Sequence, residues 1–305
     1  MLRCELYICI LDTGSKIDYN GVESSTMSIR EKLKDKQRIV VKIGSSSLTH
    51  QDNGSLNLRK IESLVRVLCE LKNMNKDVVL VSSGAIAAGR QAAGHLPRPD
   101  SISRKQALAA IGQAHLMMTY QRLFSDYSHL TAQILMTKDT LINPESYHNA
   151  RNTFEELFQL GSIPIVNEND TVATHEIVFG DNDRLSAVVA ALVHADLLIL
   201  LSDIDGMYTG DPRKNPEARL IPEVERIDDE LLSMAGGAGS DVGTGGMAAK
   251  LAAAQIAAES GVDMVIANAD DVKNIYRIID GRECGTLFHA HKNPSFNLKE
   301  YISKY

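Results

Sequence analysis

The chain carries the apolar run RIVVKI at residues 38–43, in which Lys42 stands near the end and a Gly-Ser loop follows. Six further runs of this kind are VVLVS at 78–82, TAQILM at 131–136, IPIVN at 163–167, LLILLS at 197–202, VDMVIA at 262–267 and GTLFHA at 285–290. The runs before residue 285 are too short and too uniformly apolar for amphipathic helices. We therefore predict strands that are buried on both faces of a sheet.

Helical patterns lie between these runs. They occupy residues 58–73, 103–127, 149–160, 183–193 and 247–260. Repeated alternation of strand and helix predicts an α/β fold, a three-layer sandwich with a central, mostly parallel sheet and helices on both faces. Ligands bind beyond the carboxyl ends of the strands in such sheets, so the loops after the strands are the place to look for chemistry.

Composition places the chain among ordinary globular proteins. It has 305 residues, of which 44% are hydrophobic and 23% charged, and a net charge of −7, which does not favour a nucleic-acid-binding surface. No apolar run approaches the roughly 18 residues that span a bilayer, so we expect no membrane partner. The four cysteines, Cys4, Cys9, Cys69 and Cys284, show no CxxC spacing. We expect a reducing, cytoplasmic location, with Cys69 as a small core residue.

The regular pattern begins at Arg38 and predicts one domain over residues 38–290. Residues 1–37 show only a weak pattern, and a second methionine, Met27, precedes a charged run. We interpret residues 1–37 as an N-terminal extension whose status the sequence leaves open, and 1–14 lack the basic region of a signal peptide. Residues 291–305 are expected to form a short polar tail.

The loops after the first two strands are suited to anions. A lysine inside an apolar run needs an anionic partner, and Gly44 and the serines after it offer backbone N–H groups and hydroxyls to phosphate oxygens. The alternative is an edge-strand lysine before a polar turn. Ser83 opens a stretch of small residues, Gly84 to Gly89, at a predicted helix N-terminus. Arg90 replaces the lysine of a P-loop, so we reject that motif, and tight packing of the helix on the sheet is the alternative.

Acidic and amide residues follow later strands. The segment Asn167 to Asp170 suits an ammonium group or a metal, and a solvated turn is the alternative. Asp183 opens a predicted helix, either as an ordinary N-cap or as a carboxylate that holds a nearby lysine. The residues from Ser202 to Tyr208 follow a buried strand and are a weak signal for a purine and ribose pocket.

A glycine-rich stretch precedes the last predicted helix. Residues 243–248 fit the expression GxGxxA, but no buried strand comes before them, so we reject a dinucleotide site. We interpret the stretch as a phosphate-binding loop whose helix begins near Met247. That start places Lys250 one turn into the helix, within reach of a phosphate. The alternative is a linker with a solvated lysine.

Six segments, in this order, resemble the glutamate 5-kinase branch of the amino acid kinase family. They are VVKIGSSSL, VSSGAIAAGR, NENDTVATHEI, GDNDRLSA, LLSDIDGMYTGDP and GTGGMAAKLAAA, and they lie within residues 38–290. The resemblance implies a phosphotransferase that uses ATP to phosphorylate the γ-carboxylate of L-glutamate. The product would be L-glutamyl 5-phosphate, and the reaction the first step of proline biosynthesis.

The resemblance also implies roles for individual residues. Lys42 and Lys250 would flank the transferring phosphoryl group as catalytic residues, with Asp183 orienting them. Ser83, Asp170 and Asn182 would hold glutamate. The residues implied in ATP binding are Lys42, Ser202, Asp203, Thr244, Gly245, Gly246, Met247, Ala248, Ala249 and Lys250.

Further expectations follow from the resemblance. Mg²⁺ would accompany ATP, held mainly by phosphates and waters and not by protein ligands. We expect a homo-oligomer, dimer or tetramer, with proline as a feedback inhibitor and coupling to glutamyl-5-phosphate reductase. The family's C-terminal PUA domain is expected to be absent, since the chain ends at Tyr305. Two alternatives stay open: a sister kinase such as an acetylglutamate kinase, and a non-catalytic nucleotide-binding protein on the same fold.

Overall fold

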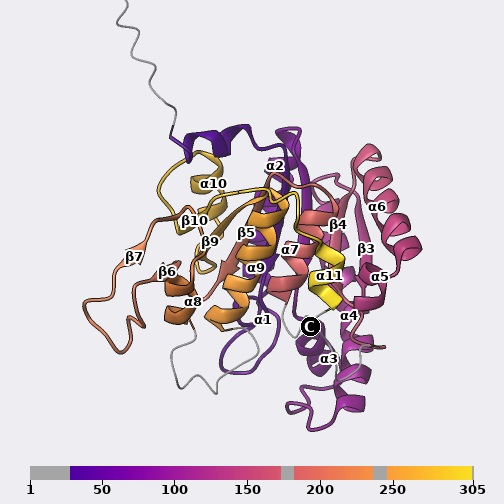
Figure 1. Ribbon diagram of the computed structural model, residues 1–305. Coiled ribbons are helices and arrows are strands. Elements are labelled where there is room, and N and C mark those ends of the chain that lie inside the picture. Colours follow the sequence, from indigo (N-terminus) through magenta and orange to yellow (C-terminus); the bar gives the residue numbers. More distant parts are fainter. Residues whose placement is uncertain (1–27, 173–181, 236–245, 304–305) are drawn as a thin grey trace, which may run out of the picture.

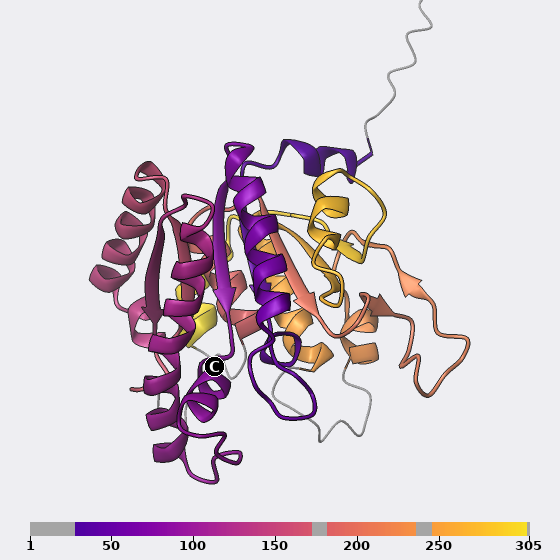
Figure 2. The ribbon, with the colours of Figure 1, turned by 180° about the vertical axis from the view of Figure 1, so that it is seen from behind.

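A central sheet of eight strands lies between two layers of helices in the computed structural model, which describes residues 28–172, 182–235 and 246–303 (Figures 1 and 2). The strand order is β3-β4-β2-β1-β5-β9-β10-β8. The strands are β1 (Arg38–Ile43), β2 (Asp77–Ser82), β3 (Thr131–Met136), β4 (Ile163–Glu168), β5 (Leu197–Ser202), β8 (Glu223–Val224), β9 (Asp263–Asn268) and β10 (Thr286–Phe288). Only β10 runs antiparallel to a neighbour in this sheet, against β9, so the prediction of a mostly parallel sheet is confirmed.

The helices cover both faces of the sheet. They are α1 (Ser45–Leu48), α2 (Leu58–Asn73), α3 (Ala85–Ala92), α4 (Ile102–Ser125), α5 (Lys138–Ile142), α6 (Pro144–Gln159), α7 (Asn182–Leu192), α8 (Asp229–Ala235), α9 (Met247–Ser260), α10 (Asn274–Ile279) and α11 (Leu298–Ser303), with the 3-10 helix η1 (Glu31–Asp35) before β1. A separate hairpin joins β6 (Met207–Tyr208) to β7 (Leu220–Ile221). The five helices that the sequence predicts are present, two of them with identical ends, and the shorter ones were missed.

Alternation along the strands divides the core into two clusters. Ile39, Val41 and Ile43 pack in the cluster that contains residues of α2 and α4, whereas Val40 packs in the cluster that contains residues of α7 and α9. Successive side chains of a strand point to opposite faces. Lys42 therefore shares the α7 and α9 face with Val40, and this register brings the lysine to the site described below.

One strand differs from the prediction of burial on both faces. The side chains of β3 are mostly half-buried and one is exposed, because β3 lies at the edge of the sheet and pairs only with β4. A run of apolar letters does not reveal whether a strand lies in the centre of a sheet or at its edge, so this correction needed the tertiary structure.

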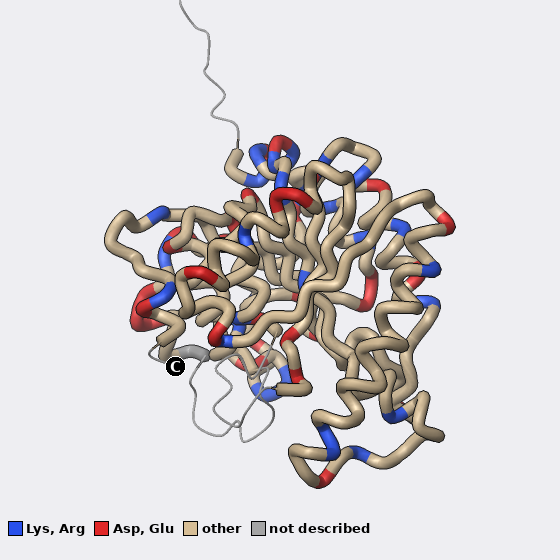
Figure 3. Tube along the Cα trace, turned by 90° about the vertical axis from the view of Figure 1, so that its right-hand side faces the viewer, with Lys and Arg blue, Asp and Glu red and all other residues tan. Residues whose placement is uncertain are grey.

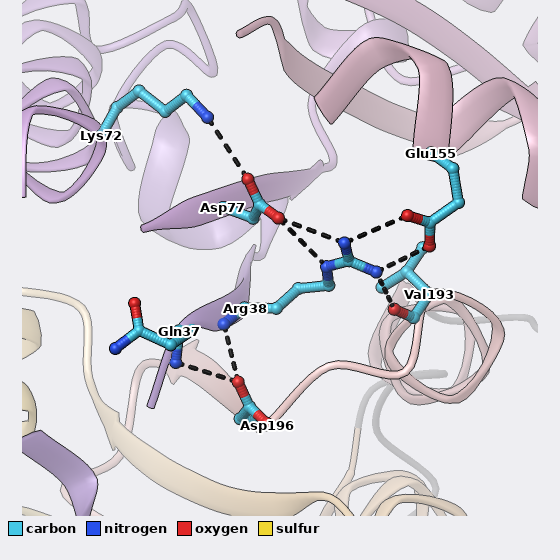
Figure 4. A network of polar contacts seen from close by, with 7 residues as sticks. All are labelled: Gln37, Arg38, Lys72, Asp77, Glu155, Val193 and Asp196. Carbon is cyan, nitrogen blue, oxygen red and sulfur yellow. Dashed lines mark hydrogen bonds and ion pairs between the residues drawn. The ribbon is translucent and has the colours of Figure 1, made fainter. Parts of the chain in front are cut away.

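A salt-bridge network anchors β1 at the end of the sheet away from Lys42 (Figure 4). The guanidinium of Arg38 donates to the Glu155 carboxylate at 2.7 and 3.2 Å, to the Val193 carbonyl at 2.6 Å and to Asp77 Oδ2 at 3.2 Å. Asp196 Oδ2 accepts the backbone N–H of Arg38 at 2.8 Å. These bonds join β1 to β2, α6 and the residue after α7, so the direction of β1 is set from its amino end.

Segments at both ends of the predicted domain pack against it. Arg30 is buried, pairs with Glu223 at 3.2 Å and donates to the carbonyl oxygens of Pro222 and Cys284 at 2.6 and 3.2 Å. Ile302 of α11 is buried in the cluster that contains residues of α7 and α9. Both residues lie outside residues 38–290. The interpretation of residues 1–37 as an extension stays a prediction, since residues 1–27 lie outside the described residues.

Other sequence predictions concern cysteine, charge and membranes. Cys69 is buried in the core, as predicted, and burial raises the pKa of its thiol to about 12. Acidic and basic residues are interspersed along the trace in Figure 3. In the described part of the chain, no helix has the length and apolar character needed to cross a membrane.

Two glycines let α3 and α4 cross at close range. A Cβ at Gly112 would lie 1.7 Å from the Ala85 carbonyl oxygen, and a Cβ at Gly89 would lie 1.9 Å from the Leu108 carbonyl oxygen. Neither position has room for a side chain. The packing alternative for the segment after β2 is therefore correct for Gly89, although the close partner is a helix and not the sheet.

We expect Gly112→Ala to lower the free energy of unfolding by about 1–3 kcal/mol, the usual cost of overpacking. The direction is informative, because alanine by itself favours a helix over glycine by about 0.8–1 kcal/mol. Denaturant titration measures the change. Ala107→Ser, at an exposed position of the same helix, should stay within about 0.5 kcal/mol of the native protein. Unchanged or higher stability of Gly112→Ala would show that α3 and α4 can accommodate a Cβ where they cross.

Candidate active site

The carboxyl ends of the central strands and the first turns of α7 and α9 lie together at one end of the sheet. β1 and β5 are neighbours in the sheet, and α7 and α9 pack side by side on one face (Figure 1). Lys42 comes from the end of β1, Asp183 from the first turn of α7 and Lys250 from the first turn of α9. Three elements that are distant in sequence therefore deliver one charged group each.

Asp183 holds both lysines. Its carboxylate is fully buried, Oδ1 pairs with Lys42 Nζ and Oδ2 accepts a hydrogen bond from Lys250 Nζ at 3.0 Å. Lys42 and Lys250 are only 5% and 6% exposed. Of the two sequence interpretations of Asp183, the structure supports the carboxylate that holds a lysine.

The electrostatics of this cluster follow from burial and charge. Burial alone would raise the pKa of Asp183, but the charges and hydrogen bonds of Lys42 and Lys250 hold that pKa below its usual value. Two ammonium groups around one carboxylate leave one net positive charge. Gly44 keeps room beside it, since a Cβ there would lie 3.4 Å from Lys42 Nζ. The cluster is suited to an anion.

Ser83 and Asn182 lie together at the same end of the sheet. Asn182 Nδ2 donates to Ser83 Oγ at 2.7 Å and to Asn167 Oδ1 at 2.9 Å. Asn167 Nδ2 in turn donates to Gln113 Oε1 of α4 at 3.0 Å. The structure thus joins two of the three residues implied in glutamate binding through direct hydrogen bonds.

Asp170, the third of these residues, lies on an adjoining cavity. The cavity has a volume of about 240 Å³ and is lined by Ala109, Ala110, Gln113, Ala114, Gln133, Leu135, Glu168, Asn169, Asp170 and Thr171. Burial and the nearby charge of Asp170 raise the pKa of Glu168 to about 7, and burial raises the pKa of Asp170. Glu168, the last residue of β4, and Asp170 after it are therefore a carboxyl pair in a cavity, which favours a cationic ligand over a solvated turn.

Besides Lys42, the described residues implied in ATP binding lie at the carboxyl end of β5 and at the start of α9. Ser202 is buried and donates to Asp203 Oδ1 at 3.0 Å, while Asp203 is exposed. Gly246 is the exposed N-cap of α9, and no described side chain caps this end. Met247, Ala248 and Ala249 form the first turn before Lys250. Thr244 and Gly245 lie outside the described residues, so their part in the phosphate loop stays a prediction.

The sequence left a metal open at Asn167 to Asp170 and assigned magnesium mainly to the phosphates of ATP and to water. Among the described residues, no group of three or more His, Cys, Asp or Glu side chains is placed to hold one. Each oxygen of the Asp183 carboxylate contacts one lysine.

Sequence reasoning missed the polar residues of α4. Gln113 and Tyr120 belong to the buried face of that helix, where Leu108, Leu116 and Phe124 also lie. The Tyr120 hydroxyl bonds Ser82 Oγ at 2.8 Å, next to Ser83. A glutamine on an otherwise apolar helix face was the available signal, because a buried amide needs a partner.

Comparisons with known proteins agree on the family. The model of the amino acid kinase family matches residues 37–268. A glutamate 5-kinase of Carboxydothermus hydrogenoformans is 51% identical over 275 residues, which cover 90% of this chain and 74% of that protein. A glutamate 5-kinase of Clostridium perfringens is 50% identical over 268 residues, which cover 87% of this chain and 99% of that protein.

Solved structures support the fold alone, because their sequences are distant. The UMP kinase of Ureaplasma parvum matches with a TM-score of 0.58 at 17% identity, covering 83% of this chain and 99% of its own. The isopentenyl phosphate kinase of T. acidophilum matches with a TM-score of 0.56 at 18% identity, covering 83% of this chain and 100% of its own.

We expect Asp183→Ala to lower the free energy of unfolding by about 3–5 kcal/mol, because it leaves two buried ammonium groups without their shared carboxylate. Denaturant titration at neutral pH measures the change. The matched control is Asp270→Ala, which removes a carboxylate that is 92% exposed and lies 3.7 Å from Lys60; a surface pair of this kind contributes less than about 1 kcal/mol. Equal effects of the two variants would contradict the assignment of Asp183 as the central counter-charge.

Glu168 should give the protein a specific pH dependence of stability. Its pKa lies near 7 in the folded protein against the usual 4.5, so between these values the folded state keeps a proton that the unfolded state has lost. Stability therefore falls as the pH rises through this window. Glu168→Gln removes this contribution. The free energy of unfolding of the variant, relative to that of the native protein, should therefore rise between about pH 5 and about pH 7.5 in denaturant titrations. Glu145→Gln, at an exposed position, is the control, and parallel profiles of all three proteins would refute the shift.

Proposed function

The chain belongs to the amino acid kinase family, and on this premise we propose that it transfers the γ-phosphoryl group of ATP to the side-chain carboxylate of L-glutamate. The product is L-glutamyl 5-phosphate. The observation that carries the chemistry is the buried Asp183 with Lys42 and Lys250 on its two oxygens. The choice of glutamate is supported by relatives that share about half of their residues with most of this chain.

Phosphoryl transfer to a carboxylate requires alignment and charge neutralisation more than covalent chemistry. A glutamate side chain has its pKa near 4.3 and is already ionised at neutral pH, so no general base is required. The difficulty is that two anions must approach each other. Lys42 and Lys250 reduce this repulsion in the proposed mechanism, and Asp183 acts as a positioning residue that keeps both ammonium groups in place.

The nucleotide occupies the neighbouring loops in this proposal. The first turn of α9, from Gly246 to Lys250, presents backbone N–H groups to phosphate oxygens, as helix N-termini commonly do. The proposal assigns Ser202, the last residue of β5, and Asp203 after it to nucleotide binding, and keeps the prediction that Thr244 and Gly245 contribute. Magnesium bound to ATP would add positive charge at the phosphates, held mainly by their oxygens and by water.

In this proposal glutamate binds between the side chains of Ser83, Asn182 and Asp170. The Asp170 carboxylate forms a charge-assisted hydrogen bond with the α-ammonium group. This contact separates the proposed function from a sister kinase that takes N-acetylglutamate, since the acetylated nitrogen carries no charge. The three side chains hold the amino-acid end while the γ-carboxylate faces the lysine cluster.

The proposal extends to the setting of the enzyme. It acts in the cytoplasm at the first step of proline biosynthesis, as a dimer or tetramer, and passes its product to glutamyl-5-phosphate reductase. Proline resembles glutamate at its α-carboxylate and ammonium group, so it would compete for the segment from Asn167 to Asp170. Raising glutamate should then relieve inhibition by proline.

The direct test is ATP turnover by the purified protein with L-glutamate, trapping the acyl phosphate with hydroxylamine as its hydroxamate. Glutamate-dependent hydroxamate is the expected result. N-acetylglutamate, carbamate and aspartate serve as parallel substrates. Faster turnover of N-acetylglutamate would replace the proposal with a sister kinase, and nucleotide binding without turnover of any acceptor would favour a non-catalytic role on the same fold.

Lys42→Met and Lys250→Met should each lower kcat by roughly 10²–10³-fold, because their charge stabilises the transferring phosphoryl group. The KM for glutamate should change far less than kcat. Steady-state hydroxamate assays measure both constants, with thermal unfolding as a check on folding. Lys60→Met, at a lysine that bonds the Ala269 carbonyl outside the cluster, is the matched control. Near-normal kcat in either folded cluster variant would refute its catalytic assignment.

A further inference from the structure

A chain of hydrogen-bonded side-chain amides joins four elements next to the residues that we propose to bind glutamate. It begins at Gln133 on β3, passes through Gln113 on α4 and Asn167 at the end of β4, and reaches Asn182 at the start of α7. Gln113 and Gln133 also line the cavity that contains Glu168 and Asp170. The chain therefore runs from this cavity to the residues that we propose to bind substrate.

The donors and acceptors of the chain all point in one direction. Asn182 Nδ2 donates to both Ser83 and Asn167, which uses its two amide hydrogens. Asn167 accepts through Oδ1 and donates through Nδ2 to Gln113 Oε1 at 3.0 Å. Gln113 Nε2 then donates to Gln133 Oε1 at 3.3 Å. With both of its hydrogens used, Asn182 has only Oδ1 to offer a ligand.

Burial makes the flip of any single amide within the chain costly. Asn167 is 4% exposed and Gln113 is 8% exposed, so a flipped amide would place two donors or two acceptors against each other without water. An asparagine amide has nearly the same shape in both orientations, so its partners decide which one is adopted. Gln113 is itself held in place, because Gly112 beside it packs directly on α3.

We propose that Gln113 is a positioning residue that orients Asn167, and through it Asn182, so that Asn182 Oδ1 accepts an N–H from the substrate's ammonium group. This inference rests on the proposed function and assigns part of its substrate specificity to a residue of α4 that bonds Asn167. An acceptor at Asn182 favours a ligand with an amino group. A dicarboxylate of the same length without an amino group has no N–H to donate to this acceptor.

The test compares glutamate with glutarate, which lacks the ammonium group. The preference is measured as the Ki of glutarate, as a competitive inhibitor, divided by the KM of glutamate. Gln113→Met removes the amide at similar size, and we expect the preference to fall by roughly 10-fold, the size of one lost hydrogen bond to a charged group. The KM for ATP should stay unchanged, and Gln121→Met, at an exposed position of the same helix, should leave the preference unchanged.

A double-mutant cycle separates positioning from general damage. In an Asn182→Ala background, Gln113→Met should have no further effect on the preference, because its action passes through Asn182. A further fall of the same size in that background would overturn the proposal. So would a native preference in Gln113→Met, or an equal loss of glutamate and glutarate affinity.

Gln133→Met provides a second variant if Gln113→Met does not fold, because Gln133 is exposed and keeps Gln113 in place. It removes one of the two bonds that hold Gln113, so the preference should fall by roughly threefold, as expected for a neutral hydrogen bond. An unchanged preference in this variant would also count against the proposal. A native protein that makes no hydroxamate from glutamate would instead overturn the proposed function and this inference with it.

Discussion

The buried Asp183 carboxylate is the constraint on which the site depends. A fully buried carboxylate requires compensating charge, and two lysines from separate elements supply it. Their charges keep the pKa of Asp183 low although burial would raise it. Because β1, α7 and α9 each contribute one group, their relative positions must be held to within hydrogen-bond distance. The packing of α7 and α9 on one face of the sheet meets that demand.

Both ends of β1 are fixed, by different means. At the amino end, Arg38 bonds to Asp77, Glu155 and the Val193 carbonyl, which ties β1 to β2, α6 and the end of α7 (Figure 4). At the carboxyl end, Lys42 pairs with Asp183 at the start of α7. β1 and α7 are therefore joined at both of their ends, which limits how far α7 can move relative to the strand.

The site contains two opposite electrostatic environments. The lysine cluster carries net positive charge and is suited to phosphate, whereas Glu168 and Asp170 form a carboxyl pair in a cavity and are suited to an ammonium group. In the proposed function the lysine cluster binds the phosphoryl group and the γ-carboxylate of glutamate. The carboxyl pair binds the α-ammonium group. Asn167 and Asn182 lie between them, and the amide chain that starts at Gln113 gives this intermediate region a defined direction.

The local pattern of the sequence determined the strands and the long helices, because periodicity and apolar runs depend on neighbouring residues: β1 and α2 have the ends that the pattern predicts. It also singled out Lys42, Asp183 and Lys250, since charged residues beside buried strands and glycine-rich loops need partners. Only the tertiary structure decided that Asp183 lies between both lysines, that β3 is a half-buried edge strand, and that Gln113 bonds Asn167, 54 positions along the chain. Those facts depend on which elements become neighbours, and long-range packing sets that order.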